Sequence, residues 1–301
     1  VVNALRKAVD GHKITPQELP FIFVRVRDIY QFKTLLGRCR ELDLLCGFVF
    51  PKFSSFNGYA YLEALEQANM KYGTSFYAMP ILESEKIIYK ETRMEEMLAI
   101  KELLDRHRDR ILNVRIGATD FSSLFSIRRG MDFTIYDIQV ISNCISDIVN
   151  VFGRAEQSYV ISGPVWEYFP ASSRLLKPQL RATPFERRGD VGREERKKIL
   201  HQSIDGLIKE VILDKANGLT GKTIIHPSHI CYVNALQSVT LEEYEDARQI
   251  VDNLDQGVLK SKAGNKMNEV KPHLRWAKKI LIKAEIYGVI NKDEDYTALF
   301  E

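Results

Sequence analysis

Short apolar runs alternate with longer amphipathic segments along the chain. The short runs have strand length and are bounded by glycine, proline or polar residues. They predict strands over residues 21–26, 47–50, 75–81, 113–116, 158–161 and 223–225. Between them, apolar positions recur every three or four residues, which predicts helices over 94–110 and 135–152. This order predicts an α/β fold built from repeated strand–helix units around a parallel sheet.

The segment 218–234 carries the densest local signal. Its run 223–225 is β-branched and lies between glycine and proline, which is typical of a strand buried on both faces. His226 follows directly, and Pro227 cannot continue a central strand. Ser228 is predicted to cap the helix that comes next. The pattern therefore predicts a histidine at the carboxyl end of a sheet strand.

Composition narrows the class of protein. The chain has 301 residues, 45% of them hydrophobic, which is enough for one large domain or two ordinary ones. Its formal charge of +3 gives no reason to expect a nucleic acid or an anionic membrane as partner. The four cysteines, at 39, 46, 144 and 231, have the spacing of neither a zinc site nor a disulfide scaffold. Without a membrane-length apolar run or a secretory signal, we expect a soluble, cytoplasmic protein.

Two carboxylates follow neighbouring predicted strands. Glu83 ends the apolar run Met79–Leu82, and Asp120 follows the glycine that ends the strand 113–116. They are about one strand–helix unit apart, so adjacent parallel strands would bring both to one edge of the sheet. Such a pair suits Mg²⁺, which keeps several waters and substrate oxygens as ligands. The alternative is that the two carboxylates are structural and bind no metal, with Asp120 as the cap of the next helix.

Cationic and aromatic residues occur at other strand ends. Arg25 and Arg27 are two residues apart, so a strand would place both on one face, where guanidinium groups can bind carboxylates. Lys52 follows the strand 47–50, a position at which a lone lysine is more often a solvated surface residue. Trp166 follows the strand 158–161 and is either a pocket wall or part of the core.

The segment 218–234 and the helix that follows it closely resemble the citrate lyase β-subunit-like branch of the HpcH/HpaI aldolase superfamily. The shared pattern is Gly-x-x-Gly-Lys-x-x-x-His-Pro-x-x-Ile-x-x-Val-Asn, and Thr240 and Glu243 have capping-box spacing in the next helix. The resemblance implies a TIM (β/α)8-type barrel over residues 1–255, with a long Arg/Pro-rich loop at 171–196 and a C-terminal helical extension at 256–301. Relatives begin with one or two further strands, so we expect this chain to begin inside the fold.

The resemblance also implies a set of site residues. Glu83 and Asp120 would be the metal ligands for magnesium, with manganese as the alternative. Arg25 would hold a substrate carboxylate or thioester oxygen, and His226 would line the site as a catalytic candidate. The remaining substrate-binding candidates are Arg27, which replaces a common asparagine, Lys52, Trp166 and Lys222. Arginines of the long loop, at 181, 187, 188 and 193, would suit coenzyme A or another phosphorylated group, or are solvated.

The implied activity is a carbon–carbon bond lyase or aldolase. It would cleave or form a bond in a hydroxy acid or acyl thioester through a stabilised enolate; coenzyme A would be part of a substrate, not a bound cofactor. The general base stays open between a metal-bound water, His226 and an acidic residue outside the sequence. The alternatives are a non-catalytic binding or assembly subunit and a malate-synthase-like condensing enzyme. The C-terminal segment 264–277 and the arginine-rich loop resemble the branch associated with tellurite-resistance gene clusters, and such extensions imply a homo-oligomer.

Overall fold

The computed structural model describes residues 2–11, 15, 18–38, 42–169, 189–191 and 202–300. These form two compact units. The first comprises residues 1–129, 135–164 and 217–219, and the second comprises 130–134, 165–216 and 220–301. The predicted loop 171–196, with its four arginines, lies outside the described residues except for 189–191. Within the described part of the chain, every helix is too short or too polar to span a bilayer.

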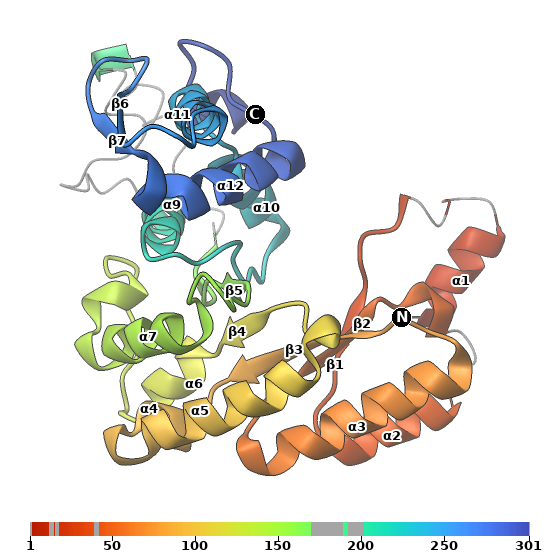
Figure 1. Ribbon diagram of the computed structural model, residues 1–301. Coiled ribbons are helices and arrows are strands. Elements are labelled where there is room, and N and C mark those ends of the chain that lie inside the picture. Colours follow the sequence, from red (N-terminus) through yellow and green to blue (C-terminus); the bar gives the residue numbers. More distant parts are fainter. Residues whose placement is uncertain are drawn as a thin grey trace. The chain divides into compact units, whose positions relative to one another are not determined.

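The first unit is built on a parallel sheet (Figure 1). Its strands follow one another in chain order: β1 (Phe23–Arg25), β2 (Gly47–Phe50), β3 (Tyr77–Leu82), β4 (Val114–Ile116) and β5 (Ile161–Ser162). Each pairs in parallel with its neighbours. The α/β class and the parallel sheet are therefore confirmed. All of these carboxyl ends lie at one edge, as strand–helix repeats require.

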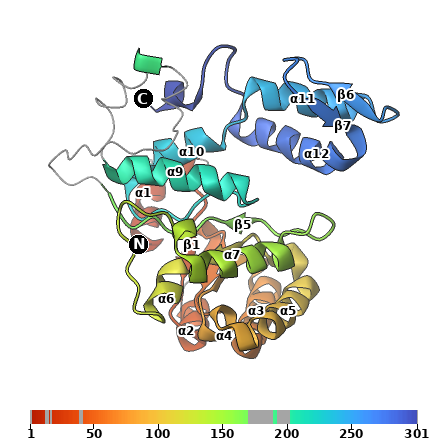
Figure 2. The same cartoon turned by 90° about the vertical axis from the view of Figure 1, so that its left-hand side faces the viewer.

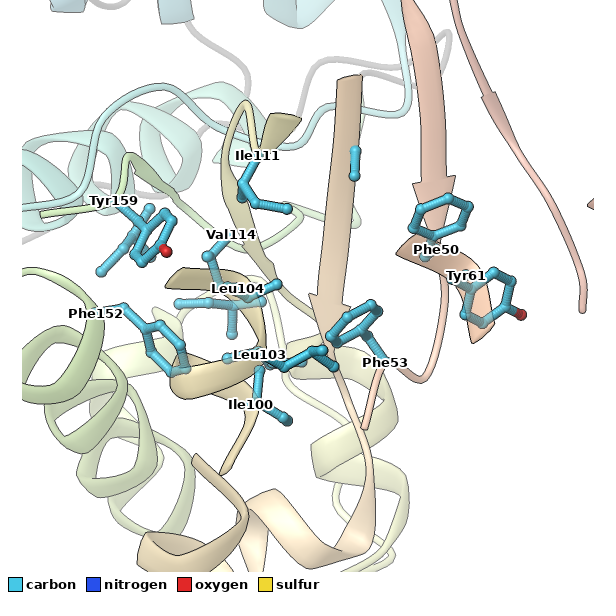
Figure 3. Packing of buried hydrophobic residues seen from close by; sticks show 14 of the residues in the cluster. Phe50, Phe53, Tyr61, Ile100, Leu103, Leu104, Ile111, Val114, Phe152 and Tyr159 are labelled. Carbon is cyan, nitrogen blue, oxygen red and sulfur yellow. The ribbon is translucent and has the colours of Figure 1, made fainter. Parts of the chain in front are cut away.

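Helices cover one face of this sheet (Figure 1). They are α2 (Ile29–Arg38), α3 (Ser55–Tyr72), α4 (Glu85–Ile88), α5 (Lys90–Arg106), α6 (Ala118–Ser123) and α7 (Gln139–Phe152), with 3-10 turns at Leu42–Leu44, Arg108–Arg110 and Ile135–Asp137. Helix α1 (Val2–Asp10) contributes no described residue to the core between these helices and the sheet. The helices predicted over 94–110 and 135–152 correspond to α5 and α7. Both present apolar positions to one continuous core, in which Phe53 lies beside Leu103 and Ile100 (Figure 3).

The second unit is mainly helical. It contains α9 (Gln202–Ala216), η6 (Pro227–His229), α10 (Ile230–Gln237), α11 (Leu241–Asp252), the antiparallel pair β6 (Val258–Lys260) and β7 (Met267–Glu269), α12 (Val270–Tyr287) and η7 (Tyr296–Leu299). Helices α11 and α12 pack side by side through Ala247, Ile250 and Ala277 (Figure 2). The capping box of Thr240 and Glu243 is present as predicted: each side chain accepts a hydrogen bond from the backbone amide of the other residue.

Three predictions for the segment 218–234 are wrong, including the one that His226 follows a sheet strand. Residues 223–225 form no strand, and Ile225 is exposed while Ile224 packs partly against the apolar core of the second unit. β-branched residues favour a strand because they pack well on a half-buried sheet surface, and such a surface exists only where another strand pairs with the segment. Ser228 does not cap the next helix either. The N-cap of that helix, α10, is His229, which makes no side-chain cap hydrogen bond. His226 caps the 3-10 turn η6 before it, and its Nδ1 accepts a hydrogen bond from the Ser228 amide at 3.2 Å.

Candidate active site at the carboxyl edge of the sheet

Glu83 is a buried carboxylate directly after β3. Its side chain is 4% exposed, and Oε1 accepts a 2.9 Å hydrogen bond from the Lys52 backbone amide. The Arg25 guanidinium, at the end of β1, lies 3.6 Å from the same oxygen and is 54% exposed. An ionised Glu83 is thus supported by one amide and one cation from two neighbouring strand ends.

The turn after β2 aims the Lys52 amide. Lys52 has a φ of 47°, in the left-handed region that a residue with a Cβ seldom adopts. The turn is held by Asn57, whose side-chain amide donates to the Lys52 carbonyl at 2.9 Å, and by the capping box of Ser54 with Asn57 at the start of α3. Because this turn fixes the peptide, the backbone of Lys52 contacts Glu83 while its side chain remains in solvent.

Gly117 makes room for Glu83 at the end of β4. Its amide donates to the Leu82 carbonyl at 2.9 Å, which brings the ends of β3 and β4 together. A Cβ placed on Gly117 would lie 2.3 Å from the Cβ of Glu83 and 2.5 Å from its Oε2. Gly117 has an ordinary φ of −94°, so the space beside Glu83, not a special backbone conformation, requires a glycine here.

Asp120 lies in the first turn of α6 and completes a carboxylate pair. Burial raises the pKa of Glu83, and the Asp120 carboxylate raises it further, against the opposing effects of the Lys52 amide and Arg25. Lys52 Nζ lies 4.0 Å from Asp120 Oδ1; both side chains are well exposed, so water screens this pair. The Asp120 carboxylate thus lies close enough to oppose the ionisation of Glu83, and a divalent cation bound between the two would favour the charged form of Glu83.

The donor set fits a hard cation that keeps water ligands. Among the described residues, no group of three or more His, Cys, Asp and Glu side chains could enclose a metal ion. Glu83 and Asp120 together supply two carboxylates at an open edge. Mg²⁺ is commonly bound in this way, by one or two carboxylates with the remaining positions left to water and substrate.

Sequence patterns assigned no role to Arg115, the residue at the centre of β4. Burial lowers the pKa of Arg115, and the nearby Arg25 guanidinium lowers it further, whereas Glu83 opposes the shift. The sequence pattern that could have indicated a role for Arg115 is a charged residue between two apolar strand residues, Val114 and Ile116. Side chains alternate along a strand, so Arg115 points away from the helix-covered core that buries its two neighbours. Arg27, by contrast, lies beyond β1, is exposed, and donates its amide to the Gln31 side chain at 2.7 Å.

The other predicted site residues belong to the second unit. Lys222 has a fully buried side chain whose Nζ lies 2.9 Å from Glu210 and 2.8 Å from Asp214. Trp166 is also fully buried, and a Cβ at Gly206 would lie 2.4 Å from its ring. Their part in substrate binding stays a prediction.

His226 is partly accessible. Its ring stacks on Phe169, with ring centroids 4.7 Å apart and planes 7° apart, and Nδ1 lies 2.8 Å from the Ser228 hydroxyl. Burial lowers the pKa of the neighbouring His229, whose Nε2 lies 3.0 Å from the Tyr168 carbonyl oxygen. His229 is completely buried, so it is a packed residue of this unit.

A parallel α/β sheet with a carboxylate pair at its carboxyl edge is typical of α/β proteins that carry their sites on strand-end loops. Residues 1–289 match the family model described as C-C bond lyase of the TIM-barrel fold, so the chain belongs to that family. No curated protein sequence matches the chain.

Solved structures share the fold, among them the following two. A citrate lyase from Burkholderia xenovorans LB400 superposes with a TM-score of 0.57 at 12% identity, covering 98% of this chain and 84% of its own. The protein CitE from Mycobacterium tuberculosis, in complex with magnesium, acetoacetate and coenzyme A, superposes with a TM-score of 0.52 at 16% identity, covering 94% and 84%. At these identities the likeness establishes a common fold.

Proposed function

We propose that this protein is a magnesium-dependent carbon–carbon bond lyase that acts on a small hydroxy acid or acyl thioester. The observation that carries the proposal is the meeting of Glu83 and Asp120 beside Arg25 at the carboxyl edge of the sheet. The family is one of carbon–carbon lyases, and one structural neighbour is described with magnesium, acetoacetate and coenzyme A. Manganese is the alternative metal, and coenzyme A would enter as part of a substrate.

The reaction class passes through an enolate, whose oxygen needs positive charge nearby. Magnesium, when bound by Glu83 and Asp120, would supply Lewis-acid charge. Arg25 is half exposed, so its guanidinium can accept a substrate carboxylate while it faces Glu83. The Lys52 amide fixes one oxygen of Glu83, which leaves the other oxygen available for a cation.

His226 is proposed as a residue that lines the site and handles a proton. Because the Ser228 amide donates to Nδ1, the neutral ring carries its proton on Nε2. In this state His226 offers a hydrogen-bond donor, and it would serve as a base only after the contact with Ser228 is broken. The substrate roles of Lys52, Arg27, Lys222 and Trp166 are part of the same proposal.

Calorimetric titration with Mg²⁺ tests the metal site. We expect wild type to bind Mg²⁺ and Asp120→Ala to bind it at least about tenfold more weakly, because half of the carboxylate pair is lost. Asp109→Ala is the matched control: this aspartate is exposed in the turn before β4, at the opposite edge of the sheet, and should change nothing. Wild type that binds no Mg²⁺, or binding untouched by Asp120→Ala, would contradict the proposal.

A substrate screen tests the reaction. Hydroxy acids and acyl thioesters are incubated with Mg²⁺, and release of pyruvate, oxaloacetate or acetyl thioester is measured, with Glu83→Ala as the blank. Activity that survives in the blank would refute this site. Metal binding without turnover of any substrate would favour the binding-subunit alternative, and condensation without cleavage would favour a malate-synthase-like enzyme.

Finer assignments accompany the proposal. We place the chain in the branch associated with tellurite-resistance gene clusters, on the resemblance of its C-terminal segment. We also propose a barrel domain over 1–255 with an extension over 256–301, a cytoplasmic location and a homo-oligomeric assembly.

A further inference from the structure

Helix α5 carries a buried carboxylate that lies outside the proposed site. Glu96 is only 6% exposed, and both of its oxygens accept hydrogen bonds from Ser55, the first residue of α3. Oε1 accepts a 2.8 Å hydrogen bond from the Ser55 amide, and Oε2 accepts a 2.7 Å bond from the Ser55 hydroxyl. Burial of a carboxylate is unfavourable unless such bonds replace its water. The pair therefore ties α5 to the first turn of α3.

The charge of Glu96 suits this position. The first amides of a helix have no partners within the helix, and the aligned peptide dipoles favour a negative charge there. The capping box satisfies the amides of Ser54 and Asn57, whereas the Ser55 amide between them is satisfied by Glu96. The start of α3 is thus fixed by its own cap and by a neighbouring helix together.

The start of α3 is connected to Glu83 through the turn after β2. Asn57, in the first turn of α3, donates its side-chain amide to the Lys52 carbonyl at 2.9 Å. The Lys52 amide in turn donates to Glu83 Oε1 at 2.9 Å. These two contacts hold both sides of the Lys52 backbone, which has a φ of 47° that is unfavourable without support. A series of contacts therefore leads from Glu96 to Glu83.

Apolar packing holds the same turn against α5. Phe53, the next residue of the turn, is fully buried beside Leu103 of α5 (Figure 3). A Cβ on Gly58 would lie 2.5 Å from the Phe53 ring and 2.8 Å from the Leu103 side chain, so this glycine lets α3 approach α5 closely. The close approach brings Ser55 within reach of Glu96.

A second buried residue of α5 holds the loop that follows Glu83. Arg93, about one turn before Glu96, is 5% exposed and donates to two backbone carbonyls of α4. Because α4 begins two residues after Glu83, this contact fixes the loop of the carboxylate independently of α3. Loss of Glu96 should therefore displace the Lys52 turn and leave the Glu83 loop in place.

We propose that Glu96 is a positioning residue for Glu83. It holds the start of α3, and through it the Lys52 turn, so that the Lys52 amide meets Glu83 Oε1. Glu96 itself contacts neither metal nor substrate. The effect on Mg²⁺ binding rests on the proposed function, whereas the contact between Lys52 and Glu83 is measurable without any ligand.

Amide hydrogen exchange, followed by NMR, tests the contact. The Lys52 amide should exchange slowly in wild type, and Glu83→Ala, which removes the acceptor, gives the rate of the unbonded amide. Glu96→Ala should raise the Lys52 rate about tenfold or more toward that limit. The Gly117 amide, which donates to the Leu82 carbonyl, should change less than about twofold.

Two results of this experiment would overturn the proposal. Equal acceleration of the Lys52 and Gly117 amides would show that Glu96 only stabilises the whole fold. Equal Lys52 rates in wild type and Glu83→Ala would show that the contact is absent in solution. Glu96→Gln should stay close to wild type, because its carboxamide offers the Ser55 amide an acceptor and the Ser55 hydroxyl a donor.

Calorimetry measures the consequence for Mg²⁺. Glu96→Ala should weaken Mg²⁺ binding about threefold to tenfold, less than the loss of a ligand, and Glu96→Gln should retain most of the affinity. Ser55→Ala completes a double-mutant cycle. Its effects on Mg²⁺ affinity and on Lys52 exchange should disappear when Glu96 is already alanine, because both substitutions break the same contact. Fully additive effects would refute action through α3.

Asn69→Ala is the matched control. Asn69 is 7% exposed in the last turn of α3, and its side chain bonds the amide and carbonyl of Phe76 at 2.8 and 3.1 Å, at the amino edge of the sheet. This variant also loses buried hydrogen bonds of α3, yet Mg²⁺ affinity and Lys52 exchange should be unchanged. Equal weakening of Mg²⁺ binding by Asn69→Ala and Glu96→Ala would refute positioning. Absent Mg²⁺ binding in wild type would contradict the proposed function, and the exchange rates would still decide the role of Glu96.

Discussion

The backbone amide of Lys52 donates a 2.9 Å hydrogen bond to Oε1 of Glu83, and Lys52 has a positive φ at this point. The lysine that sequence reasoning selected for its ammonium group therefore contacts the buried carboxylate through its backbone. Its Nζ lies 4.0 Å from Asp120 in a solvated position. The strained turn, the hydrogen bond and the raised pKa of Glu83 are parts of one arrangement, and each gives a measurable expectation.

The effect of substitutions at Lys52 on stability should depend on how readily the new residue adopts a positive φ. Lys52→Gly keeps the amide and relieves the left-handed strain, so the free energy of unfolding should equal or exceed that of wild type. Lys52→Val keeps the amide but disfavours this φ, and should lower the free energy of unfolding by about 1–2 kcal/mol and weaken Mg²⁺ binding. Urea unfolding and calorimetry measure both. Equal stability of the two variants would show that the turn has no such preference.

A methyl group at Gly117 should displace Glu83. Gly117→Ala would place a carbon 2.3 Å from the Glu83 Cβ, so we expect a loss of about 1–3 kcal/mol in unfolding free energy and more than about tenfold weaker Mg²⁺ binding. Gly37→Ala is the matched control. Gly37 lies in α2, where an added Cβ would have nothing within 4 Å, and the substitution should stabilise the helix by about 0.5–1 kcal/mol. Unchanged Mg²⁺ binding in Gly117→Ala would contradict the packing argument.

The raised pKa of Glu83 predicts a pH dependence of stability. The unfolded chain releases the Glu83 proton at the usual glutamate pKa, whereas the folded protein retains it to higher pH. The free energy of unfolding should therefore decrease as pH rises from the unfolded pKa to the raised folded pKa, and then level off with respect to this group. Glu83→Gln should remove this decrease.

In wild type, Mg²⁺ should reverse the decrease of the unfolding free energy with rising pH, because Mg²⁺ binds the ionised carboxylates of Glu83 and Asp120. Its affinity should rise with pH through the folded pKa of Glu83, and saturating Mg²⁺ should raise stability most at high pH. Urea unfolding over a pH series, with and without Mg²⁺, measures this. A stability difference between wild type and Glu83→Gln that does not vary with pH would contradict the assignment.

The buried ion group of Lys222 should be essential for stability. Burial lowers the pKa of Lys222, but Asp214 and Glu210 outweigh burial, and the net shift is upward. Lys222→Met would leave two buried carboxylates without their ammonium partner, so we expect a loss of about 3–5 kcal/mol in unfolding free energy. Adding Glu210→Gln and Asp214→Asn should recover part of it.

The control for Lys222 is Lys262→Met. Lys262 is 60% exposed and lies 3.6 Å from Glu245, so its removal should cost less than about 1 kcal/mol. Urea unfolding compares the two lysines. A loss at Lys222 no larger than that at Lys262 would show that the buried group does not stabilise the fold.

The sequence alone was sufficient for β1 to β4, the amphipathic helices α5 and α7 and the Thr240 capping box, because each depends on residues within a few positions of one another. The strand predicted over 158–161 was misplaced, since β5 comprises Ile161–Ser162. The sequence also predicted that Glu83 and Asp120 lie at one edge of the sheet, since Glu83 directly follows one apolar strand and Asp120 lies four residues after the end of the next. It could not show that residues 223–225 lack a partner strand, because β-branched residues form a strand only where another strand pairs with them.

Tertiary structure decided the contacts around those carboxylates. Lys52 and Glu83 meet because β2 and β3 pair in one register, and Gly117 is needed because β4 brings its backbone against the Glu83 side chain. The same pairing sets Arg115 beside Ser162, and helix packing turns Lys222 toward two acids in the core. Such contacts join residues far apart in the chain, and their energies depend on burial and strand register, which no local pattern of residues encodes.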